Sequence, residues 1–289
     1  MFPANFDYVA PRSIDEALQL LKHHGEDAKL LAGGHSLLPA MKLRLASPRT
    51  LIDLGNVSGL SGVRLEGDNL VIGALTVHAD VGSSDLVDKY FPGLVDAASV
   101  IGDVQVRNRG TIGGSVAHAD PAADFPVILT ALDASFVLQS IGGNRTLRVD
   151  DFFTDYFTTA MAPGEILTEI LVPLPPAGSG TAYHKLAHPA SGYVVVSAGA
   201  MITRQQSGSC ASARIAIGGL GSGPIRAVAS EAELHGKLLN PPNIAAAVGK
   251  VAEAADPDDD IYASAEYKRH MATVLARRAI EAAVQRITT

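Results

Sequence analysis

The sequence predicts an α+β protein with a larger N-terminal domain, residues 1–175, and a smaller C-terminal α+β domain, residues 176–289. A length of 289 residues is ample for two ordinary domains. The stretch VPLPPAGSG, residues 172–180, has the proline- and glycine-rich composition of a linker. Beyond it, strand-like runs precede alanine-rich helical runs, an order typical of antiparallel strands with helices packed on them.

In the first third of the chain, short strands and helices alternate. Ser13 with Glu16 three residues later is a capping-box pattern, which predicts the start of a helix, and Gly25 is a suitable stop. VRLEGDNLVIGA, residues 63–74, alternates around a turn at Gly67 and predicts a β-hairpin. The other short segments predict a strand at 29–32, a helix or turn at 37–45 and a strand at 50–54.

The rest of the chain continues in the same manner up to the linker. Helices are expected at 77–90, 92–101 and 126–132, and strands at 134–140, 146–149 and 165–173. After the linker we expect strands at 182–186, 193–204 and 211–218, then helices at 243–255 and 267–286. IGGLGSGP, residues 217–224, is not a dinucleotide fingerprint, because Pro224 stands where the pattern needs glycine. We interpret it as a connector.

Composition excludes several classes of function. A net charge of −7 gives no support to nucleic-acid binding, which needs a basic face. No run approaches the roughly eighteen apolar residues of a membrane span, and the first residues lack the pattern of an export signal. The single cysteine, Cys210, excludes an internal disulfide, a thiolate zinc site and a cysteine-ligated iron–sulfur cluster. A cytoplasmic location is expected, and any redox chemistry needs an organic cofactor or a partner protein.

Two glycine pairs are the chemically informative motifs. Gly33-Gly34 and Gly113-Gly114 each follow an apolar residue and precede a small polar residue or a histidine. Such pairs permit positive φ and close approach, so that successive amides can form a nest for an anion. The hydroxyls of Ser36, Thr111 and Ser115 could add donors, and two such turns facing each other suit a diphosphate. Either pair alone is also what an ordinary turn contains. Neither is a Walker loop.

Several nearby residues have two interpretations. His35 either contacts a cofactor or caps a turn, and Asp124 either binds a cofactor or starts the helix after it. Arg107 and Arg109 either attract a diphosphate or pair with Asp103. The remaining candidates are Tyr193, which could be ordinary core, and His118 with Asp120 and Asp124, three polar residues on one loop that do not by themselves form a metal coordination sphere.

Two long motifs identify a family. AGGHSLLPAMKLRL, residues 32–45, and QVRNRGTIGGSVAHADPAADFP, residues 105–126, closely resemble the two flavin-binding motifs of the FAD-binding medium subunit of molybdenum hydroxylases. That family includes the carbon monoxide dehydrogenase medium subunit and the flavin domain of xanthine dehydrogenase. The resemblance extends over nearly the whole chain, from FDYVAPRSIDEAL through GEILTEILVPLP into the second domain.

The resemblance implies a two-lobed FAD-binding domain of the vanillyl-alcohol-oxidase/PCMH type, with lobes of about 1–55 and 56–175. FAD is expected between the lobes, its diphosphate on the amides of residues 32–36 and on the turn of residues 111–115. Asp124 matches a ribityl or ribose contact and Tyr193 a residue against the isoalloxazine ring. Two positions depart from the family, Ser115 for a common asparagine and His35 for a frequent glutamine. The implied cofactor-binding residues are Ala32, Gly33, Gly34, His35, Ser36, Thr111, Gly113, Gly114, Ser115, Asp124 and Tyr193.

The same resemblance implies the partners and the function. A small subunit with two iron–sulfur clusters and a large subunit with molybdopterin are expected, assembled as a dimer of heterotrimers. Electrons would pass from the clusters to FAD in this chain and on to an external acceptor. Two alternatives stay open, a self-sufficient flavin oxidase of related fold and a non-redox scaffold protein.

Overall fold

The N-terminal lobe is a small parallel sheet with two helices, in a computed structural model that describes residues 2–287. The sheet has the order β1-β3-β2, with both neighbouring pairs parallel. Ser13 accepts a hydrogen bond from the Glu16 amide at 3.1 Å and so begins the first helix, which Gly25 ends at φ 54°. The elements are β1 Asp7–Val9, α1 Ile14–His24, η1 Gly25–Asp27, β2 Ala28–Leu31, α2 Leu37–Lys42, β3 Thr50–Asp53 and η2 Leu54–Asn56.

The second lobe is a five-stranded antiparallel sheet in the order β4-β5-β10-β6-β7. The expected hairpin forms its edge, since β4 and β5 pair across Gly67 at φ 56°. The strands are β4 Val63–Glu66, β5 Asn69–Gly73, β6 Ser135–Ser140, β7 Gly143–Arg148 and β10 Ile166–Pro173, with η3 Val149–Asp151 and a separate pair, β8 Phe153–Asp155 and β9 Thr158–Thr159.

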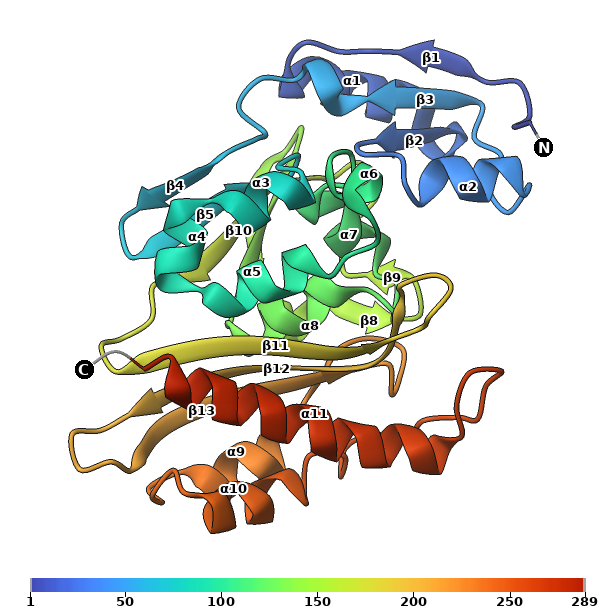
Figure 1. Cartoon of the computed structure of the whole chain (residues 1–289). Helices are drawn as coiled ribbons and strands as arrows, with labels where there is room; N and C mark the ends of the chain where they lie inside the picture. The colour runs from blue at the N-terminus through green and yellow to red at the C-terminus, as the bar shows by residue number, and fades with distance from the viewer. Residues whose placement is uncertain (1, 288–289) are drawn as a thin grey trace.

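Six helices lie between β5 and β6 in sequence and form a layer beside this sheet (Figure 1). They are α3 His78–Ser83, α4 Asp85–Tyr90, α5 Pro92–Ser99, α6 Val104–Arg107, α7 Ile112–His118 and α8 Asp124–Ala131. Fully buried side chains of the helices and the sheet, among them Phe91, Leu94, Phe125 and Phe136, form one apolar core. Burial of each such side chain stabilises the fold by roughly 1.5–3 kcal/mol.

The C-terminal domain is a four-stranded antiparallel sheet in the order β11-β12-β13-β14, with α11 on one face and α5 and α8 of the second lobe on the other (Figure 1). Two glycines permit this close packing. A β-carbon at Gly93 of α5 would lie 2.7 Å from the Ala182 amide of β11, and one at Gly180 would lie 3.1 Å from the Ile287 amide. The elements are β11 Ser179–Ala187, β12 Val194–Arg204, β13 Cys210–Gly218, β14 Ile225–Arg226, α9 Val228–Leu234, α10 Pro241–Val248 and α11 Ala265–Gln285.

The predicted α+β class is confirmed, with corrections to individual elements. Residues 77–90 form two helices, because Ser84 is extended and caps the second through the Val87 amide. The helix expected at 243–255 ends at Val248. The sequence analysis missed β1, α6, α9, β14 and the β8–β9 pair, all of seven residues or fewer. Among residues 2–287, no helix has the length and apolar character to cross a membrane.

Candidate cofactor site

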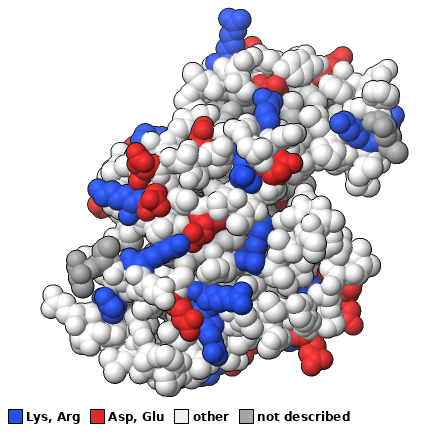
Figure 2. Space-filling view, in the orientation of Figure 1, with Lys and Arg blue, Asp and Glu red and all other residues white. Residues whose placement is uncertain are grey.

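The two glycine stretches, about eighty residues apart in sequence, lie directly against each other. A β-carbon at Gly33 would overlap the Arg109 carbonyl oxygen and would lie 2.7 Å from the Gly110 Cα. A β-carbon at Gly114 would lie 3.7 Å from that of Ala32. The β2–α2 connection of the first lobe therefore contacts the start of α7 in the second. The space-filling view shows a notch beneath α2, where the two lobes meet (Figure 2).

The first stretch carries unpaired amides. Gly34 has φ 76°, a backbone conformation that favours glycine. The carbonyls of Gly34 and Ser36 accept the first bonds of α2, from Leu38 at 3.0 Å and from Ala40 at 3.1 Å. Within residues 2–287, no protein acceptor takes the amide protons of residues 33–36. These four amides belong to one backbone turn at the interface between the lobes. Such a set of free donors fits an anion such as a diphosphate.

The second stretch differs from the expected turn. Gly113 and Gly114 lie in the first turn of α7 at negative φ, because Thr111 caps that helix and accepts from the Gly114 amide at 3.1 Å. The Gly113 amide donates to the Ala74 carbonyl at 2.8 Å, and Ser115 donates to the Thr111 carbonyl at 3.0 Å. Glycine is required at 113 because a β-carbon there would lie 2.6 Å from the Ala74 oxygen. This stretch therefore packs against the first one, and the amides of residues 113–115 already donate to acceptors within the protein.

A buried histidine that the sequence analysis missed lies beside the second stretch. His78 is 6% exposed, its ring packs 5.1 Å from that of Phe125, and its amide donates to the Gly110 carbonyl at 2.9 Å. Its Nδ1 has no protein partner among the residues described. Burial, together with the electrostatic effects of His35 and Arg107, lowers the pKa of His78 to about 4, so it is neutral at pH 7. No motif marks this position, which is the first residue of a short helix.

Arg107 is held by the backbone of its own loop. Its guanidinium donates to the carbonyls of Ile101 at 3.0 Å and Gly102 at 3.1 Å. Asp103 instead caps α6, accepting from the Val106 amide at 2.8 Å. The proposed Arg107–Asp103 pair is therefore not what positions this arginine. His35, on the first stretch, is exposed, and its Nδ1 lies 3.0 Å from the Gly33 carbonyl, which bends its ring back onto its own turn.

Asp124 belongs to a buried ion pair. It is 5% exposed at the start of α8, and its Oδ1 accepts from the Tyr183 hydroxyl at 2.9 Å and lies 2.9 Å from the Lys185 Nζ. Burial raises the pKa of Asp124 to about 6, against the opposing effects of the lysine charge and of both hydrogen bonds. Tyr183 and Lys185 were missed, although their spacing of two residues on β11 puts them on one face of the strand.

The same lysine fixes the loop that carries Tyr193. Lys185 Nζ also donates to the Gly192 carbonyl at 2.8 Å, and the Val194 amide donates to the Ala122 carbonyl at 3.1 Å. The tip of the β11–β12 hairpin is thereby tied to the segment between α7 and α8. Tyr193 is 48% exposed there, so it is not an ordinary core residue. Partial burial raises its pKa, as does the negative charge of Asp120.

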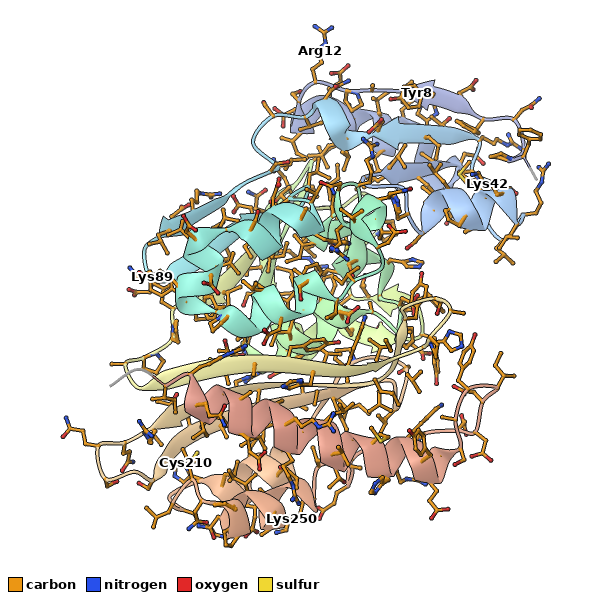
Figure 3. The ribbon with its side chains drawn as sticks, in the orientation of Figure 1. Tyr8, Arg12, Lys42, Lys89, Cys210 and Lys250 are labelled. Atoms are coloured by element: carbon orange, nitrogen blue, oxygen red, sulfur yellow. The ribbon has the colours of Figure 1, made fainter. Side chains whose placement is uncertain are left out.

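No grouping of potential metal ligands accompanies this arrangement in residues 2–287. The His118 ring packs 5.2 Å from that of Phe157, and Asp124 faces Lys185 rather than His118. Cys210 is fully buried in β13 of the C-terminal domain (Figure 3), and burial raises the pKa of its thiol to about 11. A thiol held neutral in this way is a poor metal ligand.

Comparisons with known proteins agree with this geometry. The profile of the FAD binding domain in molybdopterin dehydrogenase matches residues 4–175, and that of the CO dehydrogenase flavoprotein C-terminal domain matches residues 181–283. The chain is 42% identical to the carbon monoxide dehydrogenase medium chain of Hydrogenophaga pseudoflava over 284 residues, which cover 98% of each protein.

One further relative and one solved structure are similarly close. Subunit alpha of the 6-hydroxypseudooxynicotine dehydrogenase complex of Paenarthrobacter nicotinovorans is 38% identical over 286 residues, 99% of this chain and 97% of the relative. The solved carbon monoxide dehydrogenase of H. pseudoflava that lacks the Mo-pyranopterin moiety contains a chain that superimposes with a TM-score of 0.96 at 42% identity, covering 100% of both chains.

Proposed function

The chain belongs to the family of FAD-binding medium subunits of molybdenum hydroxylases, which includes the carbon monoxide dehydrogenase medium chain, and we propose that it passes electrons from partner iron–sulfur clusters to an external acceptor. As a member it is a component of an oxidoreductase. One observation carries the proposal. The chain combines backbone amides that fit the diphosphate of FAD with a single buried cysteine, so it can hold the flavin but not the clusters.

The proposed site uses the two glycine stretches unequally. The amides of residues 33–36 donate to the diphosphate, while the second stretch supports them and adds the Ser115 hydroxyl. When FAD is bound, Tyr193 would hold the isoalloxazine ring and Asp124 would hold the sugar-derived hydroxyls. This is supported by the half-exposed ring of Tyr193 and by the pairing of Asp124 with Lys185. The proposed cofactor-binding residues are Ala32, Gly33, Gly34, His35, Ser36, Thr111, Gly113, Gly114, Ser115, Asp124 and Tyr193. FAD, when bound, supplies the redox chemistry by accepting single electrons and delivering two.

The protein's own contribution is positioning and electrostatics. The ammonium of Lys185 favours the ionised form of Asp124 and so opposes the burial that raises the pKa of that carboxyl to about 6. The same ammonium fixes the Gly192 carbonyl and so holds the Tyr193 loop. Neutral His78 adds no charge beneath the second glycine stretch. Since these groups are buried, they do not need to reorganise when FAD binds.

The expected assembly remains part of the proposal. It comprises a small subunit with two iron–sulfur clusters and a large subunit with molybdopterin, as a dimer of heterotrimers in the cytoplasm. The domains are proposed as 1–175, with lobes of about 1–55 and 56–175, and 176–289; the matched ranges 4–175 and 181–283 support this division. Relatives named for carbon monoxide and for 6-hydroxypseudooxynicotine are 42% and 38% identical to this chain, so similarity does not select a substrate.

Purification of the chain alone tests the proposal against both alternatives. We expect the isolated chain to bind FAD and to become yellow, yet to keep its flavin oxidised when candidate substrates are added without partners. Bleaching of the flavin by substrate alone would establish the self-sufficient oxidase. A colourless chain whose melting temperature does not change on addition of FAD would leave only a non-redox role.

A further inference from the structure

Gly110 lies between the first glycine stretch and a buried ring of the second lobe. A β-carbon at Gly33 would lie 2.7 Å from the Gly110 Cα, so the two backbones are already in contact. On another side of the same Cα, a β-carbon at Gly110 would lie 2.5 Å from the Nε2 of His78 and 2.9 Å from its Cδ2. The Gly110 Cα is therefore in contact with Gly33 of the first lobe and with the His78 ring of the second.

The His78 ring is fixed in its place. His78 is the first residue of α3, and its amide donates to the Gly110 carbonyl at 2.9 Å. Its ring is 6% exposed and packs edge-on against that of Phe125 at 5.1 Å. Helices α3 and α6 meet at the top of the second lobe, beneath the first lobe (Figure 1). Since a ring in a close-packed interior does not rotate freely, the His78 ring limits how far Gly110 can move away from Gly33.

Stability alone does not account for a histidine at this position. The His78 Nδ1 is buried and has no hydrogen-bond partner in the described part of the chain. A buried polar atom without a partner destabilises the folded state, and an apolar side chain would avoid that cost. The imidazole provides a flat, stiff edge of defined length. Its Nε2 reaches the Gly110 backbone, and a side chain that ended at the place of Nδ1 would fall short of it.

We propose that His78 is a positioning residue for FAD, whose ring edge holds the Arg109–Gly110 peptide against Gly33. It acts through that peptide and not by contact with the cofactor. The inference rests on the proposed function, since the amides of residues 33–36 are the donors assigned to the diphosphate. If the peptide moved back, the turn of residues 33–36 would lose the backbone against which it packs. Donors that are not held from behind bind a ligand less tightly.

Two substitutions test which part of the ring matters. The side-chain amide of glutamine can occupy the place of Nε2, whereas that of asparagine reaches only the place of Nδ1. We expect His78→Gln to bind FAD within about twofold of the unchanged chain, and His78→Asn to bind it about tenfold more weakly. Quenching of flavin fluorescence in the full chain gives both dissociation constants.

A double-variant cycle with Gly33→Ala separates positioning from general destabilisation. The alanine methyl pushes against Gly110, and removal of the ring edge gives that peptide room to move back. In the Gly33→Ala chain, His78→Asn should therefore strengthen FAD binding by about tenfold, although it weakens binding in the unchanged chain. Phe152→Leu is the control for loss of a buried ring, since Phe152 packs in the same core at 4.4 Å from the Phe136 ring. It should change FAD affinity by the same factor in both backgrounds.

Three results would overturn the proposal. These are equal FAD affinities of His78→Gln and His78→Asn, an equal loss of affinity on His78→Asn in both backgrounds, and a coupling of Phe152→Leu to Gly33→Ala as strong as that of His78→Asn. Should Gly33→Ala fail to fold, the comparison of glutamine with asparagine still decides.

Failure of the unchanged chain to bind FAD would instead contradict the proposed function. The same cycle, measured by urea unfolding without FAD, would then still test the contact between residues 78 and 110. In that measurement His78→Asn should lower the free energy of unfolding less in the Gly33→Ala chain than in the unchanged chain. Equal losses in the two chains would overturn the inference about His78.

Discussion

Replacing Gly33 by alanine tests the contact between the two glycine stretches. The added β-carbon would overlap the Arg109 carbonyl oxygen and would lie 2.7 Å from the Gly110 Cα, and both atoms belong to backbone that cannot rotate away. Since Gly33 does not have positive φ, the substitution adds bulk without backbone strain. The two lobes must therefore move apart at this point. Such overpacking costs about 1–3 kcal/mol.

Gly33→Ala should also weaken FAD binding, because we expect FAD to need the two glycine stretches at their present separation. A cost of 1–3 kcal/mol corresponds to roughly five- to 150-fold weaker binding. Quenching of flavin fluorescence gives the dissociation constant, and urea unfolding gives the free energy of unfolding. Gly142→Ala is the matched control, since its β-carbon would meet only the Ser140 hydroxyl at 3.7 Å.

Two outcomes would refute this reasoning. If Gly33→Ala bound FAD as tightly as the unchanged chain, the close contact would not matter for the cofactor. If Gly142→Ala weakened FAD binding equally, the loss would not be specific to the site. Should Gly33→Ala fail to fold, Gly34→Val offers a second route, since φ 76° disfavours any side chain there by about 1–2 kcal/mol. That variant should lose FAD while most of the fold remains.

Three further predictions concern the supporting residues. Thr111→Ala removes the cap of α7 and should lower the free energy of unfolding by about 1 kcal/mol, whereas Thr111→Ser should not, as urea titration would show. Lys185→Met leaves the buried Asp124 carboxylate without its cation and should lower the free energy of unfolding by about 3–5 kcal/mol. It also removes the hydrogen bond to the Gly192 carbonyl, so a protease should cleave between residues 188 and 193. A loop that stays uncleaved would contradict the role of Lys185 in holding it. The pKa of His78 is 6.5 in the unfolded chain and about 4 in the folded chain, so the unfolded chain takes up the proton first as the pH falls. The free energy of unfolding should therefore decrease between pH 6.5 and pH 4, by up to about 3 kcal/mol. The non-titrating His78→Gln should lose less stability across that window, and parallel urea curves for the two proteins would exclude the effect.

Local chemistry made much of the fold predictable. The Ser13 cap, the stop at Gly25 and the hairpin around Gly67 each depend on residues close together in sequence, and all three appear as expected. The proline-rich interval also predicted a break, and β10 ends at Pro173 before β11 begins at Ser179.

Long-range contacts explain what the sequence could not show. The glycines at 113 and 114 were interpreted as a turn, because nothing near them indicates that Gly113 must approach Ala74, a contact between α7 and the end of β5. Asp124 and Lys185 are 61 residues apart, so only the folded chain shows them as a pair. His78 has no motif at all. Its part in the site follows from burial beside Gly110.

Hydrogen exchange at single amides, with and without FAD, tests most directly how the diphosphate is held. The amides of residues 33–36 have no acceptor among the residues that the structure describes, whereas those of Gly113, Gly114 and Ser115 already donate within the protein. We predict that FAD slows exchange strongly at residues 33–36 and changes it little at residues 113–115. Unchanged exchange at residues 33–36 in the FAD-bound chain would contradict the account.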